Sequence, residues 1–392
     1  MKSRKIIFVV LDGVGIGELP DASSYGDQGA NTLGNIARSV GGLQLPNLQR
    51  LGLARLTNID GLDPTVPVEG CFGKMAEQSK GKDSTTGHWE LAGIVTEHAF
   101  PVYPKGFPPE LLDRFLSVTG CKGFLGNKPA SGTEIIQELG DQHNETGFPI
   151  VYTSGDSVFQ IAAHEEVIPL ADLYEICAKT RTEVVVGKHR VGRVIARPFV
   201  GTAGKYSRTP NRKDFAVEPD GKTLLDDLAE HKIETIAIGK IDDLFSGRGL
   251  SEKIHTRSNQ DGIDRIVEES GRLESGFLMA NLVDFDMLYG HRQDPRGFAA
   301  ALEEFDVALP RIIDCLTDGD LLMITADHGN DPTDKSTDHT REYVPMLCYG
   351  SQVSRAVDLG VRHSFADAGK TVAEFFNVPN SLAGSSFLSL VQ

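Results

Sequence analysis

The run Ile6-Ile7-Phe8-Val9-Val10-Leu11-Asp12 sets the fold class of this chain. Six consecutive apolar residues predict a short strand that is buried on both faces, and such strands belong to parallel sheets covered by helices. Similar apolar runs recur at 235–238, 276–283 and 321–325. They alternate with amphipathic helical patterns, for example at 297–309, where we expect Pro310 to end the helix. The sequence therefore predicts an α/β protein with a mostly parallel sheet between helices.

The composition is that of a globular protein. The chain has 392 residues, of which 40% are hydrophobic and 24% charged, so it is long enough for two or three domains. These values exclude a disordered tail, a collagen and a disulfide scaffold. The net charge is −16, from 39 Lys+Arg against 55 Asp+Glu. Because phosphate backbones are bound by basic surfaces, we expect no nucleic-acid partner.

Several features predict a cytoplasmic protein without a membrane partner. The five cysteines are odd in number and widely spaced, with no CxxC pair, which favours a reducing compartment. The first apolar run ends at Asp12 after six residues and is too short for a secretory signal. Nowhere do eighteen apolar residues follow one another, so no membrane span is expected.

Two stretches rich in Pro and Gly, 99–109 and 198–221, indicate crossings between domains. We predict an inserted domain at 100–217 within a discontinuous core formed by 1–99 and 218–392. The alternative is that both stretches are long loops.

The predicted insert contains a basic segment. Residues 181–213 hold nine basic residues and one acidic residue, Glu183. Arg193 and Arg197 alternate with apolar residues, which places them on one face of a strand where they could converge on an anion. The alternative is a solvated charged surface.

Acidic residues follow three of the predicted core strands. Asp12 ends the first, Asp286 follows the run at 276–283, and Asp327 follows the run at 321–325. Ligands of open parallel sheets bind beyond the carboxyl ends of the strands, although a single Asp there is often a turn or helix cap. The nearby histidines are His291, His328 and His339. Six such ligands are too many for one tetrahedral zinc and suit two divalent ions, with Mn²⁺ and Zn²⁺ both possible.

The segment 80–91 predicts a loop that enters a helix, with Asp83 and Ser84 at the helix start. One interpretation is a simple N-cap. The other is a nucleophile, because a hydroxyl at a helix N-terminus lies where a phosphate is favoured, and a metal can activate it.

These motifs together closely resemble the bacterial phosphopentomutase family of the alkaline phosphatase superfamily. The resemblance rests on 12–17, 82–90, 281–292, 325–331 and 337–345, with further matches at 127–134 and 161–166. It implies an alkaline-phosphatase-like core with a smaller inserted α/β cap domain. It also implies an isomerase that uses two Mn²⁺ to interconvert ribose or deoxyribose 1-phosphate with the 5-phosphate, as in nucleoside catabolism. One ion would be held by Asp12, Asp327, His328 and the nucleophile oxygen, and the other by Asp286, His291 and His339.

One position departs from the family pattern. The family nucleophile is a threonine, whereas this chain has Ser84, followed by Thr85. We expect Ser84 to be the nucleophile, with Thr85 as the alternative. The reaction would pass through a phosphorylated enzyme and a 1,5-bisphosphate, with a sugar bisphosphate as activator.

The expected contacts to the pentose phosphate are Asp156, Arg193, Arg208 and Lys240. Each of these could instead be an ordinary salt bridge or strand-end cap. Rival functions are a cofactor-independent phosphoglycerate mutase, a phosphatase, and a non-catalytic binding protein.

Overall fold

The structure is a computed structural model that describes residues 4–392. Contacts between Cα atoms divide the chain into two compact units. The first unit contains the residues up to Ala99 together with Pro219–Gln392, and the second is Phe100–Glu218. Within residues 4–392, no helix combines the length and the apolar character that crossing a membrane would need.

The first unit is built on an eight-stranded sheet with the order β10-β9-β11-β1-β12-β13-β2-β14. The strands are β1 (Lys5–Leu11), β2 (Cys71–Met75), β9 (Thr235–Ile238), β10 (Glu252–Ile254), β11 (Gly276–Leu282), β12 (Leu321–Thr325), β13 (Val344–Tyr349) and β14 (Val357–Arg362). The five strands from β10 to β12 are parallel, while β13 is antiparallel to both of its neighbours. The predicted mostly parallel α/β fold is confirmed.

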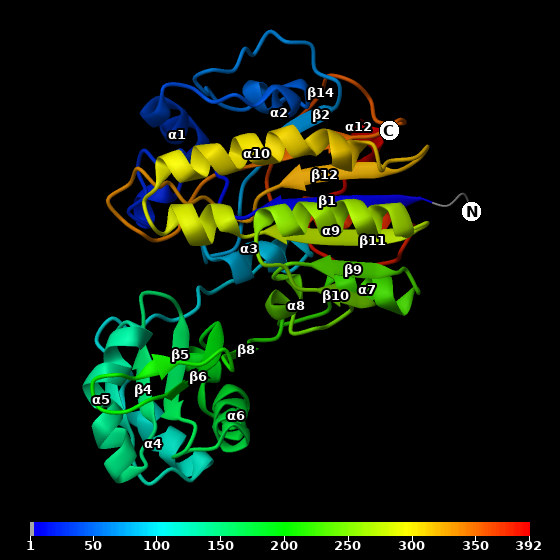
Figure 1. Ribbon diagram of the computed structural model, residues 1–392. Coiled ribbons are helices and arrows are strands. Elements are labelled where there is room, and N and C mark those ends of the chain that lie inside the picture. Colours follow the sequence, from blue (N-terminus) through cyan, green and yellow to red (C-terminus); the bar gives the residue numbers. More distant parts are fainter. Residues whose placement is uncertain (1–3) are drawn as a thin grey trace. The chain divides into compact units, whose positions relative to one another are not determined.

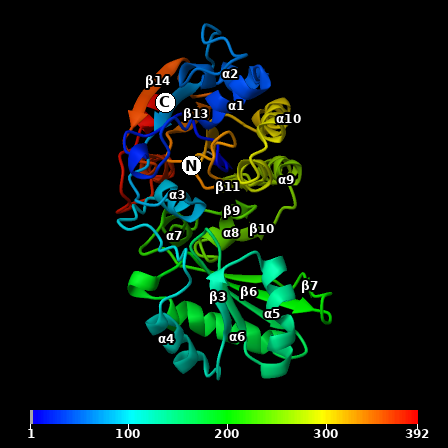
Figure 2. The same cartoon turned by 90° about the vertical axis from the view of Figure 1, so that its left-hand side faces the viewer.

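The central strands are apolar on both faces because helices cover both sides of the sheet. Every residue of β1, β11 and β12 is buried. In Figure 1, α9 (Asn259–Arg272) and α10 (Pro295–Ile313) lie across the front of these strands. Figure 2 shows α3 (Ser84–Leu91) and α7 (Leu224–Glu230) on the other side of the sheet, where both contact α11 (Ala366–Phe375).

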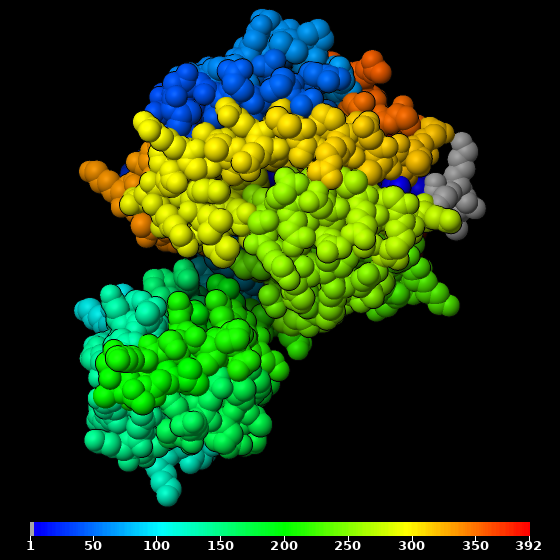
Figure 3. Space-filling view, in the orientation of Figure 1, coloured from blue at the N-terminus to red at the C-terminus, as the bar shows by residue number. Residues whose placement is uncertain are grey.

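The remaining helices of the first unit are short or peripheral. They are α1 (Thr32–Val40), α2 (Pro46–Arg50), α8 (Ile241–Leu244) and α12 (Leu388–Val391), with 3₁₀ turns at Ala22–Ser24 and Leu53–Arg55 and a π-helical turn, η5, at Phe285–Gly290. Of these, α1 and α2 pack against α10, which forms a broad surface in the space-filling view (Figure 3).

The expectation that Pro310 ends the helix at 297–309 was wrong. The helix α10 continues through Pro310 to Ile313. Proline has no N–H to donate to the carbonyl four residues earlier, which is that of Asp306. In the structure, Nδ2 of Asn47 donates to this carbonyl at 2.9 Å, so the lost helical hydrogen bond is replaced from a neighbouring segment.

The second unit has its own six-stranded sheet, in which β3-β4-β5-β6-β7 are neighbours and β8 also pairs with β6. The strands are β3 (Leu125–Pro129), β4 (Ile150–Thr153), β5 (Val158–His164), β6 (Arg193–Val200), β7 (Ser207–Arg208) and β8 (Lys213–Ala216). Its helices are α4 (Pro109–Thr119), α5 (Gly132–Thr146) and α6 (Leu170–Lys179), followed by a π-helical turn at Thr180–Val184 and a 3₁₀ turn at Gly187–His189. Two apolar clusters form its core, so this unit has a hydrophobic interior of its own.

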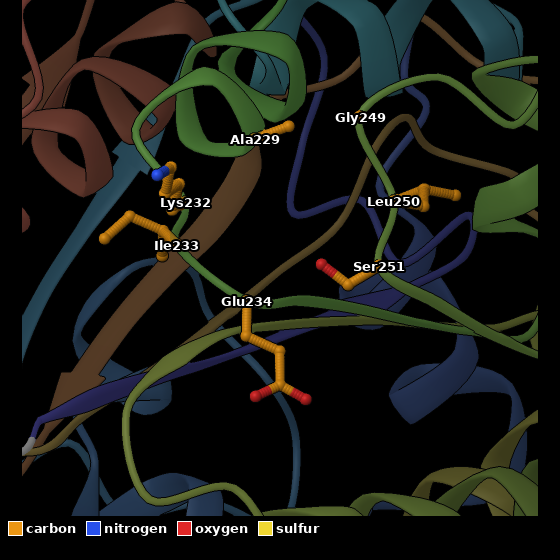
Figure 4. A pocket seen from close by; sticks show the side chains of 7 residues that line it. All are labelled: Ala229, Lys232, Ile233, Glu234, Gly249, Leu250 and Ser251. Atoms are coloured by element: carbon orange, nitrogen blue, oxygen red, sulfur yellow. The ribbon is translucent and has the colours of Figure 1, made fainter.

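A pocket of about 450 Å³ lies in the first unit at the amino end of β9 (Figure 4). Its lining includes Lys232 and Glu234, which both precede the strand, and Ser251. The predicted ligands follow the carboxyl ends of the strands, so this pocket is not the predicted site.

The sole tryptophan, Trp89, is fully buried on α3, and its Nε1 donates to the carbonyl of Leu244 at 2.9 Å. We expect Trp89→Ala to lower the free energy of unfolding by about 3–5 kcal/mol, because it leaves a large cavity and an unpaired carbonyl. Urea unfolding followed by circular dichroism measures this loss. Val307→Ala on α10 is the control, since Val307 is 76% exposed and its change should stay within about 0.5 kcal/mol. Equal effects of the two variants would contradict the assignment of Trp89 to the core.

Candidate metal centre

Four side chains that follow two strands or start one helix meet at the carboxyl edge of the large sheet. Nε2 of His328 lies 3.3 Å from Oδ1 of Asp12 and 3.3 Å from Oδ2 of Asp327. The same nitrogen lies 3.1 Å from Oγ of Ser84, the first residue of α3. The adjacency of β11, β1 and β12 explains the meeting, because neighbouring parallel strands end at one edge of the sheet.

A second group lies beside the first. Nε2 of His291 is 3.2 Å from Oδ2 of Asp286, and Nε2 of His339 is 3.4 Å from Oδ1 of the same carboxylate. The two histidine nitrogens lie 3.1 Å apart. Possible ligand atoms of Asp286 also lie within 4.8 Å of those of Asp12 and His328. The structure thus brings all six predicted ligands together, and Asp286 stands between the two groups.

The donor atoms fit divalent cations. Asp12 and Asp327 each have one oxygen held by the protein, through Asn281 and the amide of Gly13 respectively. The other oxygen of each, Oδ1 of Asp12 and Oδ2 of Asp327, is buried and faces Nε2 of His328 at 3.3 Å. Buried carboxylate oxygens are costly unless a cation or proton neutralises them. Two groups of oxygen and imidazole ligands therefore suit two ions such as Mn²⁺ or Zn²⁺.

The charges of the site shift the pKa values of its groups. Burial raises the pKa of the Asp327 carboxyl, but the facing rings of His328 and His88 and the amide of Gly13 lower it to about 2. Burial lowers the pKa of His328, whereas the carboxylates of Asp327 and Asp12 raise it well above the usual value.

Helix α3 presents Ser84 to this site. Asp83 is its N-cap, and its carboxylate accepts from the amide of Thr86 at 3.1 Å and from Oγ1 of Thr86 at 2.6 Å. Ser84 is 6% exposed and contacts His328, whereas Thr85 is half-buried. Both readings of segment 80–91 are therefore compatible with this geometry, since Asp83 caps the helix and the Ser84 hydroxyl faces the candidate ligands.

The loop before Ser84 is fixed by Arg341, which is 1% exposed. The Arg341 guanidinium donates to the carbonyls of Glu77, Ser79 and Gly81 at 2.7 to 2.9 Å, and it pairs with the Glu77 carboxylate at 2.6 Å. Lys82 adds ion pairs to Asp27 and Asp338. The segment that carries His339 thus also holds the segment that carries Ser84.

Sequence reasoning missed several polar residues around the ligands. They are His88, Asn281, Asn330, Arg341 and Glu342. Asn330 donates to Oδ1 of Asp286 at 2.6 Å, and Glu342 accepts from the amides of Gly17 and Thr32. A usable signal existed for Asn281, because it is a polar residue within an apolar strand, and such a residue needs a buried partner.

The predicted substrate contacts are spread over both units. In the second unit, Arg193 starts β6 and its amide donates to the carbonyl of Ser157, which places it beside Asp156. Arg208 pairs with Phe199 near the other end of β6, about 20 Å of strand away from Arg193. Lys240 lies in the first unit, two residues after β9, at the edge where the candidate ligands gather. Within the second unit, Arg193 thus lies next to the residue that follows Asp156, whereas Arg208 lies near the other end of β6.

Known proteins are similar to this chain over nearly its whole length. The model of the Metalloenzyme superfamily matches residues 4–380. Phosphopentomutases of Dictyoglomus thermophilum and Acetivibrio thermocellus are 56% and 54% identical to this chain, over 99% of it and 99% and 100% of those proteins. The solved structure of the PH0037 protein from Pyrococcus horikoshii aligns with a TM-score of 0.51 at 15% identity, over 98% of this chain and 100% of that one.

The family model and the fold define the class of protein first, an α/β member of the Metalloenzyme superfamily. Identity above 50% along nearly the whole length then gives the family. The chain belongs to the phosphopentomutase family and is therefore an isomerase.

Removing the buried guanidinium of Arg341 should destabilise the first unit. We expect Arg341→Met to lower the free energy of unfolding by about 3–5 kcal/mol, since it leaves the Glu77 carboxylate buried without its partner. Urea unfolding measures the change. Arg50→Met is the matched control, because Arg50 forms an exposed ion pair with Glu69 and should cost less than about 1 kcal/mol. A loss below about 1 kcal/mol for Arg341→Met would show that the cation does not hold this loop.

Proposed function

We propose that this enzyme interconverts ribose 1-phosphate or deoxyribose 1-phosphate with the corresponding 5-phosphate. The observation that carries the proposal is the meeting of the Ser84 hydroxyl with Asp12, Asp327 and His328 in a chain of this family. A nucleophilic hydroxyl beside two groups of metal ligands is what phosphoryl transfer needs.

The proposed cofactors are two divalent ions, Mn²⁺ by preference and Zn²⁺ as the alternative. Asp12, Asp327, His328 and the Ser84 oxygen would hold one, and Asp286, His291 and His339 the other. When bound, the two ions neutralise phosphate charge and favour the ionised hydroxyl.

In the proposed reaction, Ser84 rests as a phosphoserine. The free hydroxyl of the sugar monophosphate attacks this phosphorus, a new P–O bond to the sugar forms, and the bond to Ser84 Oγ breaks. The product is a 1,5-bisphosphate, which turns in the site and returns its other phosphate to Ser84. The N-terminus of α3 favours the negative charge at Ser84 throughout. A sugar bisphosphate would act as activator by phosphorylating Ser84 at the outset.

The second unit is proposed to be a cap that binds the pentose phosphate and excludes water from the phosphoserine. Asp156 would accept a hydrogen bond from a sugar hydroxyl, while Arg193 and Lys240 would neutralise the phosphate remote from Ser84. Arg208 lies too far along β6 from Arg193 to contact the same phosphate. A cytoplasmic location is part of the proposal, supported by five free cysteines.

The proposed activity can be measured directly. The enzyme should convert ribose 1-phosphate to ribose 5-phosphate in the presence of Mn²⁺, and removal of the metal by a chelator should slow it by about a thousandfold or more. Adding Mn²⁺ back restores the rate. Release of inorganic phosphate without isomerisation would indicate a phosphatase instead. Conversion of 3-phosphoglycerate would favour the phosphoglycerate mutase.

The nucleophile is tested by paired substitutions. Ser84→Ala should reduce kcat on the order of 10⁴-fold, because it removes the hydroxyl that faces the candidate ligands. Ser84→Thr keeps the hydroxyl and should retain measurable activity. Thr85→Ala is the matched control and should stay within about tenfold of the parent enzyme. If Thr85→Ala loses activity while Ser84→Ala keeps it, the assignment is wrong, and intact mass after incubation with a sugar bisphosphate gives the same answer independently.

A further inference from the structure

His88 is a buried histidine beside the candidate centre that is not one of the six ligands. It lies one turn after Ser84 on α3 and is 0% exposed. Its Nδ1 is 2.8 Å from the main-chain oxygen of Ser84 and 3.0 Å from Oδ2 of Asp327. The ring thus touches both the backbone of the nucleophile and a predicted metal ligand.

These contacts fix which ring nitrogen carries the proton. A carbonyl and an ionised carboxylate can both accept a hydrogen bond, and neither can donate one. Nδ1 of His88 must therefore carry a hydrogen. The other nitrogen, Nε2, lies 3.3 Å from Nδ2 of Asn281, which is a donor, so Nε2 accepts.

Asn281 extends the contacts to a second ligand. Its Nδ2 donates to Oδ2 of Asp12 at 2.9 Å. The amide oxygen in that place would repel the carboxylate, so Asp12 sets the orientation of the amide. The two hydrogens of Nδ2 then serve Asp12 and His88, and Asn281 itself is 0% exposed.

We propose that His88 and Asn281 are positioning residues that hold Asp12, Asp327 and the first turn of α3 in fixed relation around one of the two ions. The inference rests on the proposed two-ion site. Four elements are joined in this way, since Asp12 follows β1, Asn281 lies in β11, His88 lies in α3 and Asp327 follows β12. Partners that orient ligating carboxylates typically change metal affinity by about 10–100-fold when they are lost.

The test is the number and affinity of Mn²⁺ ions bound by the metal-stripped full chain, measured by titration with electron paramagnetic resonance of free Mn²⁺. The parent protein should bind two ions. His88→Phe keeps the ring size and removes both hydrogen bonds, so it should weaken one ion by about 10–100-fold and leave the other unchanged. The unchanged ion is the one held by Asp286, His291 and His339, which His88 does not support.

A conservative variant separates positioning from packing. In His88→Asn, the side-chain amide can replace the Nδ1–H donor, so part of the lost affinity should return. His143→Phe is the matched control: His143 is also 0% exposed, its Nδ1 faces the carbonyl of Phe148 at 2.7 Å, and its Nε2 accepts from the amide of His164. It lies in the second unit, and its substitution should leave both ions bound as in the parent.

A second readout needs no substitution. Long-range ¹H–¹⁵N correlation of the metal-free parent protein should show His88 with its proton on Nδ1, and a proton on Nε2 alone would overturn the proposal. Unchanged binding of both ions by His88→Phe would also overturn it, as would an equal loss in His88→Phe and His143→Phe. A parent protein that binds fewer than two ions would instead defeat the proposed function, and the positioning role with it.

Discussion

The burial of three carboxylates at one edge of a parallel sheet is the constraint on which this structure depends. Asp12, Asp286 and Asp327 are at most 5% exposed. Ionised carboxylates this close together and removed from water are stable only with positive charge between them. Nε2 of His328 lies 3.3 Å from two of these carboxylates, and two divalent ions would supply positive charge at the same edge. The parallel strands keep these groups in place, because neighbouring strands end at one edge of the sheet.

The loops around this edge of the sheet hold the charged groups in position. Residues 339–342 illustrate it. His339 faces Asp286, and Arg341 holds the loop before Ser84. Glu342 accepts from Oγ1 of Thr340 at 2.6 Å and from the amide of Thr32, the first residue of α1. A short stretch thus connects the candidate ligands, the loop before Ser84 and α1, which explains why polar residues are buried so densely here.

The sequence was most informative where a pattern has one physical solution. Apolar runs such as 6–11 and 321–325 are strands because a run buried on both faces fits a covered sheet. The six candidate ligands were predictable because strand-end carboxylates must meet once the strands are parallel neighbours. The residues that orient them were harder to find. His88 lies in a helix and Arg341 in a loop, and their partners are far away in the chain, so spacing carries no signal. The prediction that Pro310 ends α10 failed for the same reason, since the compensating Asn47 is about 260 residues away.

The central claim is that two divalent ions occupy this edge of the sheet, and anomalous diffraction from crystals grown with Mn²⁺ tests it most directly. The account predicts two anomalous peaks, one within bonding distance of Asp12, Asp327 and His328, and the other within bonding distance of Asp286, His291 and His339, roughly 3.5 to 4 Å apart. A single peak, or peaks elsewhere in the molecule, would contradict it.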